Sequence, residues 1–197
     1  MAPVKSDKPE APPRLEDNSD IIDASTFEQI LEMDDDDDRD FSKGIVYGFF
    51  DQAKTTFEKM ESAVEKKQLD ELSSLGHFLK GSSATLGLTN VKDGCEKIQH
   101  FGAGKDETGT TTQPDDEISL KNIKTTVDEV KIAYAKVERF LRRYYGEKLP
   151  EKEEKEEEVK EEVKETKETT KEEVKETEKE EKKETKEDTK DEEPKKK

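Results

Sequence analysis

The sequence is poor in residue types that stabilise or anchor many other proteins. Its 197 residues include one cysteine, no tryptophan and two histidines, and hydrophobic residues make up only 27%. A single cysteine cannot form an internal disulfide, which is typical of a reducing compartment. The longest strongly apolar run, residues 45–50, is far too short to span a bilayer, and the N-terminus lacks the apolar core of a signal peptide. We therefore expect a soluble, intracellular protein.

Charged residues are abundant and divide the chain into three parts. They form 45% of the chain, whose net charge is −17. Residues 147–197 hold 23 acidic and 16 lysine side chains and almost no large apolar residue, so they predict a low-complexity tail, either an isolated charged helix or disordered. Residues 1–20 are expected to be a disordered, proline-containing lead, which leaves a folded domain at 21–146. Because that domain is also acidic, its charge argues against nucleic acid and anionic membranes as partners.

The apolar residues of the domain recur every three or four positions, which indicates amphipathic helices. Ser25 and Glu28 fit a capping box before a short helix that ends near Met33. Asp40 is the expected N-cap of a longer helix, whose stripe is Phe41, Ile45, Phe49, Ala53, Phe57, Met60 and Val64.

Three more helices are predicted further along the chain. One runs from about Leu69 to Leu86, and another follows Asn90 with Val91, Cys95 and Ile98 inward. The last carries Ile123, Val127, Val130, Tyr134, Val137, Leu141 and Tyr144. No segment alternates as a half-buried strand does. The expected fold is all-α, an up-and-down four-helix bundle with an additional short N-terminal helix.

The most informative stretch begins at His77. At about 100° per residue, its imidazole points away from the leucines that form the apolar stripe of the same helix: Leu72, Leu75, Leu79 and Leu86. Gly81 lies one turn further on, where a glycine costs about 1 kcal/mol relative to alanine and so needs a reason. Lys80 places an ammonium beside the ring. This arrangement suits a phosphoryl acceptor, although an exposed helical histidine beside a lysine is more often a solvated surface residue.

The same residues also carry a resemblance to a known family. Residues 77–87 resemble the signature of histidine-containing phosphotransfer (HPt) proteins, in which the histidine is followed by x-Leu-Lys-Gly-Ser and, ten positions on, by a glycine. Residues 33–44, the helix from Ile45, and residues 95–99 resemble fungal members of the yeast osmosensing type. The resemblance covers about residues 24–145.

Membership of that family implies a role for each residue of the motif. His77 would carry the phosphoryl group, Lys80 would help to neutralise it, and Gly81 would leave space for the partner. Gln99 would hydrogen-bond the imidazole, while Ser82 and Gly87 would support the site, Gly87 by permitting close packing. Family members often carry a basic residue a few positions beyond the glutamine. Ala103 stands there in this chain, and whether Lys105 replaces it is open.

The resemblance further implies a relay between receiver domains. The chain would accept a phosphoryl group from an aspartate of a hybrid sensor histidine kinase and pass it to a response regulator, as a carrier and not an enzyme. It would use no cofactor of its own, with Mg²⁺ bound by the partner. We expect a monomer in cytoplasm and nucleus. As a hypothesis, Ile30, Met33 and Phe78 form the apolar docking patch, although Phe78 could equally belong to the core.

Two other functions remain possible from the residues alone. One is a helical adaptor that binds partners through the bundle surface and the charged tail, without chemistry. The other is an enzyme with His77 as a general base, which is the weaker reading because the sequence places no carboxylate or nucleophile near it.

The acidic run at 34–38 lacks the glycine and glutamate spacing of an EF-hand. Cys95 is interpreted as a core thiol and His100 as polar surface.

Overall fold

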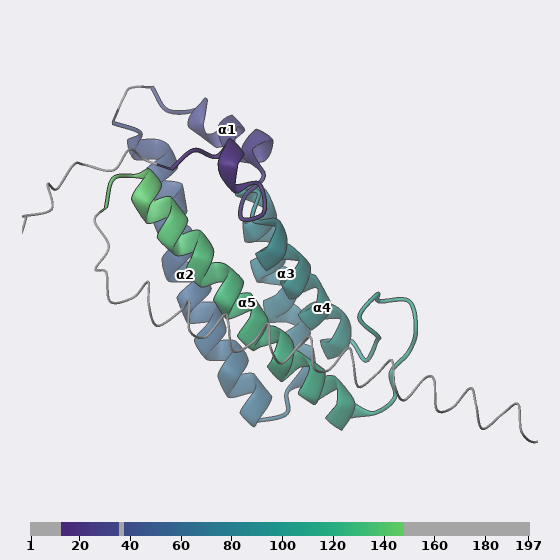
Figure 1. Cartoon of the computed structure of the whole chain (residues 1–197). Helices are drawn as coiled ribbons and strands as arrows, with labels where there is room; N and C mark the ends of the chain where they lie inside the picture. The colour runs from purple at the N-terminus through teal and green to yellow at the C-terminus, as the bar shows by residue number, and fades with distance from the viewer. Residues whose placement is uncertain (1–12, 36–37, 148–197) are drawn as a thin grey trace, which may run out of the picture. The chain divides into compact units, whose positions relative to one another are not determined.

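The computed structural model describes residues 13–35 and 38–147, which all belong to one compact unit. A short 3-10 helix, η1 (Glu16–Asn18), precedes five α-helices: α1 (Ala24–Leu31), α2 (Asp40–Glu65), α3 (Leu69–Thr85), α4 (Thr89–Gly102) and α5 (Asp116–Tyr144). The four long helices alternate in direction and contact each other in a ring, α2 with α3, α3 with α4, α4 with α5, and α5 with α2 (Figure 1). The predicted all-α bundle with an extra short helix is confirmed.

The starts of two helices differ from the sequence prediction. Asp23, and not Ser25, is the N-cap of α1, because its carboxylate accepts hydrogen bonds from the Ser25 backbone N–H at 3.1 Å and from the Thr26 hydroxyl at 2.7 Å. The hydrogen bonds from Thr26 and Ser25 lower the pKa of Asp23. Aspartate is among the best N-cap residues, since it satisfies backbone donors that have no partner within the helix. In α2 the N-cap is Arg39, in a left-handed conformation, and Asp40 is the first helical residue.

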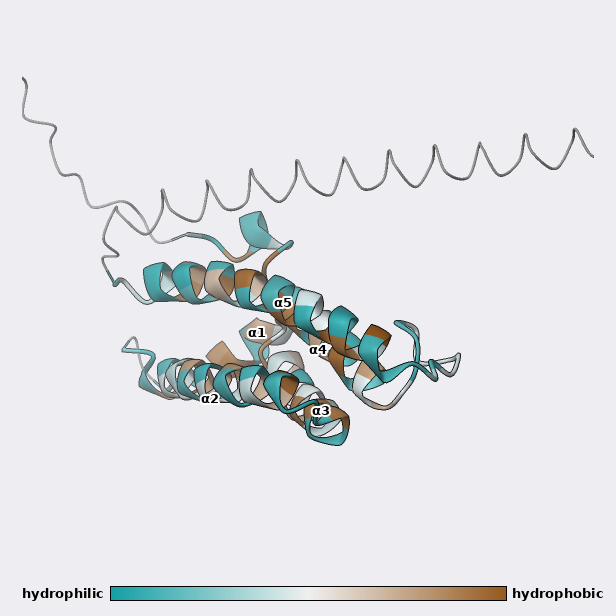
Figure 2. Cartoon of the chain, turned by 90° about the horizontal axis from the view of Figure 1, so that it is seen from below, coloured by the Kyte–Doolittle hydropathy of each residue, from teal (hydrophilic) through white to brown (hydrophobic). Residues whose placement is uncertain are grey.

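The bundle core follows the predicted apolar stripes closely. Every inward residue predicted for α4 is fully buried, and the α5 stripe is buried from Ile123 to Leu141. Apolar ribbon segments face one another between the helices (Figure 2). Phe41 is an exception: its side chain is 46% exposed, so its assignment to the buried stripe was wrong. It lies in the first turn of α2, at the end of the bundle, where Val46 and Phe50 supply the inward face instead.

Two glycines bring α3 and α4 unusually close together. A methyl group built at Gly76 would lie 2.8 Å from both the Cys95 carbonyl oxygen and the Gln99 nitrogen. One built at Gly102 would lie 2.6 Å from the Ser73 nitrogen and 2.7 Å from the Leu69 carbonyl oxygen. Only a residue without a side chain fits at either position. The backbones of α3 and α4 are therefore in direct contact. Side chains of α4 lie next to the α3 residues that neighbour His77 in the sequence.

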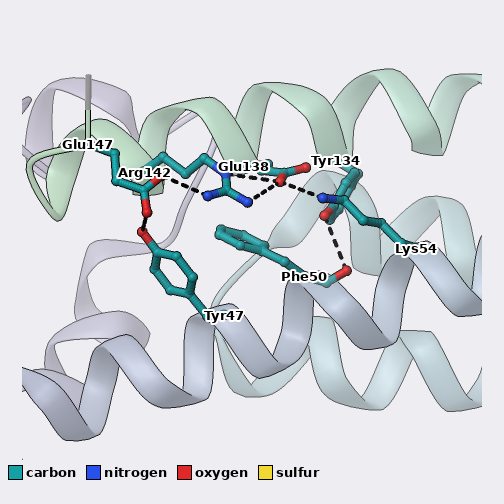
Figure 3. Close-up of polar contacts among 7 residues, drawn as sticks. All are labelled: Tyr47, Phe50, Lys54, Tyr134, Glu138, Arg142 and Glu147. Carbon is teal, nitrogen blue, oxygen red and sulfur yellow. Dashed lines mark hydrogen bonds and ion pairs between the residues drawn. The ribbon is translucent and has the colours of Figure 1, made fainter. Parts of the chain in front are cut away.

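The seam between α2 and α5 is closed by polar residues (Figure 3). Arg142 donates to Glu138 from Nε at 3.0 Å and to Glu147 from Nη1 at 2.7 Å. Lys54 of α2 also donates to Glu138, at 2.9 Å, and Tyr47 of α2 donates to Glu147. Burial, together with the bond to Glu147, raises the pKa of Tyr47 to about 12. Charged groups of α5 thus reach across to α2 and fix the end of the last helix.

The predicted disordered lead begins to be ordered earlier than residue 21. Leu15 is buried with 8% exposure, η1 follows it, and Asn90 of α4 donates to the Asp20 carbonyl at 2.7 Å. The tail prediction lies outside the described residues, except for Glu147. In the part that the structure describes, no helix is long and apolar enough to cross a membrane.

Candidate functional site

The side chain of His77 projects from α3 into solvent. Leu72 and Leu79, which lie on the opposite side of the helix, are fully buried, and Leu75 retains only 9% exposure. Ser74, Gly81 and Ala84, which share the face of His77, are exposed as well. The leucine stripe anchors α3 in the bundle and thereby directs the imidazole outward, as helical periodicity requires. An exposed ring nitrogen is available to a large partner.

Gly81 differs from the other glycines of α3 and α4 in what surrounds it. A methyl group built there would have no described residue within 4 Å, whereas one at Gly76 or Gly102 would collide with backbone. Packing within the chain therefore does not require a glycine at this position. The surface beside His77 is left bare one helical turn along, and a partner's backbone can approach the ring from that side.

Lys80 follows His77 by three residues on α3 and is held by a residue of the neighbouring helix. Its ammonium is 3.2 Å from Oε1 of Glu96 on α4, and its side chain is only 25% exposed. The sequence reasoning missed Glu96. Its position three residues before Gln99, on the same face of α4, was the available signal. The cation expected to meet a phosphoryl group is therefore already paired with a carboxylate in the unmodified protein.

Gln99 lies on α4 against the helix that carries His77. Its backbone carbonyl accepts a hydrogen bond from the Ser73 hydroxyl at 3.0 Å, a contact that sequence reasoning also missed. Its side-chain oxygen, Oε1, is buried and has no hydrogen-bond partner. Among the described residues no hydrogen bond joins Gln99 to His77, so that expected contact stays a prediction. A buried acceptor without a donor is costly, so this oxygen is able to accept a hydrogen bond.

The two supporting residues have local structural partners. Gly87 has a φ of +72°, and a methyl group built there would lie 2.8 Å from the Asp23 carbonyl oxygen. The carbonyl of Gly87 accepts from the Asp23 N–H, also at 2.8 Å, so this glycine joins the end of α3 to the start of α1. The hydroxyl of Ser82 donates to the Phe78 carbonyl at 3.3 Å.

The structure divides the three residues of the predicted docking patch. Phe78 and Met33 are exposed, by 52% and 59%, so Phe78 does not belong to the core. Ile30, in contrast, retains only 6% exposure, and its inclusion in the patch was wrong. α1 turns Ile30 and Phe27 inward onto the bundle, whereas Met33 lies just beyond the end of the helix. The exposed Phe41 is an apolar surface residue that the sequence reasoning had placed in the core.

The basic residue expected beyond Gln99 has no clear counterpart. Ala103 is the C-cap of α4 and is exposed. Lys105 lies past the helix end, where its backbone N–H donates to the His100 carbonyl at 3.0 Å and it forms the bridge to Thr112.

Other chemically notable residues have structural roles. His100 Nδ1 lies 3.0 Å from the Glu107 carbonyl, and its ring packs against Gly109, so it orders the loop between α4 and α5. Cys95 is fully buried, which raises the pKa of its thiol to about 12 and leaves it protonated. Asp34 accepts from the Ser42 N–H at 2.9 Å near the start of α2. Asp36 and Asp37 lie outside the described residues, and no group of three or more metal-binding side chains occurs among those described.

Fold and site together define a class of protein. An antiparallel four-helix bundle that presents one exposed imidazole, a neighbouring lysine and a bare glycine one turn away has the architecture of a histidine phosphotransfer domain. Comparison with known families agrees, since the Hpt domain model matches residues 45–133. The chain belongs to the Hpt family, as its resemblance to fungal members predicted.

The relatives are fungal phosphorelay proteins. The chain is 44% identical over 122 residues to phosphorelay intermediate protein YPD1 of Saccharomyces cerevisiae, covering 58% of this chain and 72% of that protein. It is 46% identical over 125 residues to multistep phosphorelay regulator 1 of Schizosaccharomyces pombe, covering 64% of this chain. That match spans only 42% of the fission-yeast protein, so the chain corresponds to less than half of that relative's length.

Two solved structures show the same bundle. The crystal structure of yeast Ypd1p has a TM-score of 0.57 at 34% identity, covering 66% of this chain and 98% of that one. A co-crystal structure of S. cerevisiae Ypd1 with the receiver domain of its downstream response regulator Ssk1 has a TM-score of 0.59, with the same identity and coverage.

Proposed function

We propose that the chain is a phosphorelay intermediate whose His77 accepts a phosphoryl group from a receiver-domain aspartate and passes it to another. The observation that carries the proposal is the exposed imidazole of His77 on the same helix as Gly81, where a methyl group would meet no described residue within 4 Å. Family membership supports the same chemistry. Similarity to a protein crystallised with a response-regulator receiver domain supports the choice of partner.

The transfer requires little of this chain beyond position and charge. A ring nitrogen of neutral His77 attacks phosphorus in line; an N–P bond forms, the P–O bond to the aspartate breaks, and the carboxylate leaves with the bond electrons. The other ring nitrogen keeps its proton, for which Gln99 Oε1 is the acceptor we propose. In this proposal Lys80, three residues further along α3, helps to neutralise the phosphoryl oxygens. The reverse reaction on a second receiver domain completes the relay.

The divalent cation that the transfer needs is assigned to the partner. The chain acts as a carrier without a nucleotide site, and Mg²⁺ belongs to the partner's receiver domain. Chelation should then stop transfer onto His77 without releasing a phosphoryl group already there.

The phosphoryl donor would be a hybrid sensor histidine kinase and the acceptor a response regulator. From the resemblance to the family, whose downstream regulators can be nuclear, we propose that the protein is present in cytoplasm and nucleus, which imaging of a fluorescent fusion would check.

Docking is assigned to the exposed apolar residues Phe78 and Met33. Phe78 follows His77 directly, so a partner whose aspartate reaches the ring also covers Phe78. Phe78→Asp should leave the bundle folded, since the side chain is outside the core, and should slow transfer at least tenfold by placing a charge in the interface. An unchanged transfer rate in a folded Phe78→Asp protein would exclude this surface.

The decisive experiment uses a receiver domain that carries radiolabelled phospho-aspartate. The full chain should acquire a label that is labile to acid and stable to alkali, as phosphohistidine is. His77→Gln should acquire none, whereas His100→Gln, the matched control at the other histidine, should be labelled. Label on the His77→Gln protein would refute the assignment. No label on any folded variant would favour the non-catalytic adaptor.

A further inference from the structure

The pairing of Lys80 with Glu96 links two helices at the site. Lys80 Nζ and Glu96 Oε1 are 3.2 Å apart, and the two side chains are 25% and 45% exposed. The contact depends on the close approach of α3 and α4 at Gly76, where backbone atoms of both helices touch. A carboxylate is thereby fixed beside the ammonium of Lys80, which follows His77 by three residues on α3.

We propose that Glu96 is a positioning residue that competes with the phosphoryl group for Lys80 and so keeps phosphorylated His77 ready to give up its phosphoryl group. The inference rests on the proposed function, because it concerns the same histidine. Glu96 does not touch the reacting atoms; it acts through Lys80. No role at the site follows for Glu96 from the phosphotransfer motif itself.

The physical reason lies in what a carrier must do. Transfer exchanges a P–O bond to an aspartate for an N–P bond to His77, and must be reversible enough for the next receiver domain to take the group. A lysine with no other partner would stabilise the doubly negative phosphoryl group strongly and retain it. Glu96 both shares the ammonium and repels the incoming negative charge. Its carboxylate therefore lowers the affinity of the site for the phosphoryl group.

The test measures the equilibrium between phospho-aspartate on a receiver domain and phosphohistidine on the full chain. Glu96→Gln keeps the shape of the side chain and removes its charge, so we expect the ratio of phosphohistidine to phospho-aspartate to rise about two- to fivefold, the range for a partly exposed pair. The increase should shrink in 1 M salt, where charges are screened within about 3 Å.

Two further variants separate positioning from a general effect. Glu107→Gln is the matched control. Glu107 pairs with Lys97 of α4, the helix that also carries Glu96, and the loss of this pair should leave the ratio unchanged. In a Lys80→Met background, Glu96→Gln should have much less effect than in the wild type. A ratio that falls or stays constant in Glu96→Gln, or an equal rise in both backgrounds, would overturn the proposal. If wild-type protein is labelled on His77 and only these ratios fail, the proposed function survives.

Discussion

At the scale of single residues, the site depends on what stands beside His77 and on what is missing there. Gly81 is the clearest case, since a glycine in the interior of a helix costs stability and no contact with a described residue explains it. Selection for the bundle alone would favour alanine. The cost is understandable if the space above Gly81 is used by a partner.

A graded pair of substitutions tests this explanation. Gly81→Ala should raise the free energy of unfolding by about 0.5–1 kcal/mol, because alanine is the better helix former, and should slow phosphotransfer several-fold. Gly81→Gln should also remain folded and should reduce transfer by more than tenfold. Urea denaturation measures the first quantity, and single-turnover labelling by a phosphorylated receiver domain measures the second. Wild-type transfer by a folded Gly81→Gln protein would show that the space is not needed.

At the scale of helices, the contact between α3 and α4 positions the residues around the ring. Gly76 lets the two backbones touch, next to the backbone of Gln99, and Glu96 of α4 pairs with Lys80 of α3. The short distance is a property of the pair of helices, because either helix alone would tolerate a larger residue. Glycines on a single helix can thus have opposite purposes, Gly76 for internal packing and Gly81 for external access.

Gly76 should therefore respond to alanine in the opposite direction to Gly81. Gly76→Ala places a methyl group 2.8 Å from two backbone atoms of α4, which forces the helices apart. Overpacking of this kind typically costs about 1–3 kcal/mol, and the urea midpoint should fall accordingly. A Gly76→Ala protein as stable as Gly81→Ala would mean that the helices can separate without cost.

At the scale of the whole bundle, the polar seam between α2 and α5 closes the ring of helices. Burial alone would raise the pKa of Glu138, but hydrogen bonds from Lys54 and Arg142 outweigh it and lower the pKa below the ordinary value (Figure 3). A carboxyl group with a lowered pKa in the folded state stabilises the fold above its unfolded pKa, near 4.5, and loses that contribution as the pH falls through the folded value.

The pH dependence of stability should therefore change when Glu138 is replaced. Glu138→Gln should cost about 1–3 kcal/mol at pH 7, since charge-assisted hydrogen bonds to a largely buried carboxylate are lost. The difference from wild type should narrow as the pH falls below about 4.5. Urea denaturation between pH 7 and pH 3 measures it, with Glu61→Gln, at an exposed ion pair, as the control. A difference that stays constant with pH would show that the charge of Glu138 does not contribute.

The sequence alone determined the helices, the inward stripes and the outward direction of His77, because these depend on local periodicity. It misplaced Phe41 and Ile30, since the inward face of a terminal turn depends on how the next element covers it. The pairing of Lys80 with Glu96 and the unpartnered oxygen of Gln99 became visible only in three dimensions. Such contacts are set by the spacing and rotation of two helices, and periodicity along one helix does not contain that information.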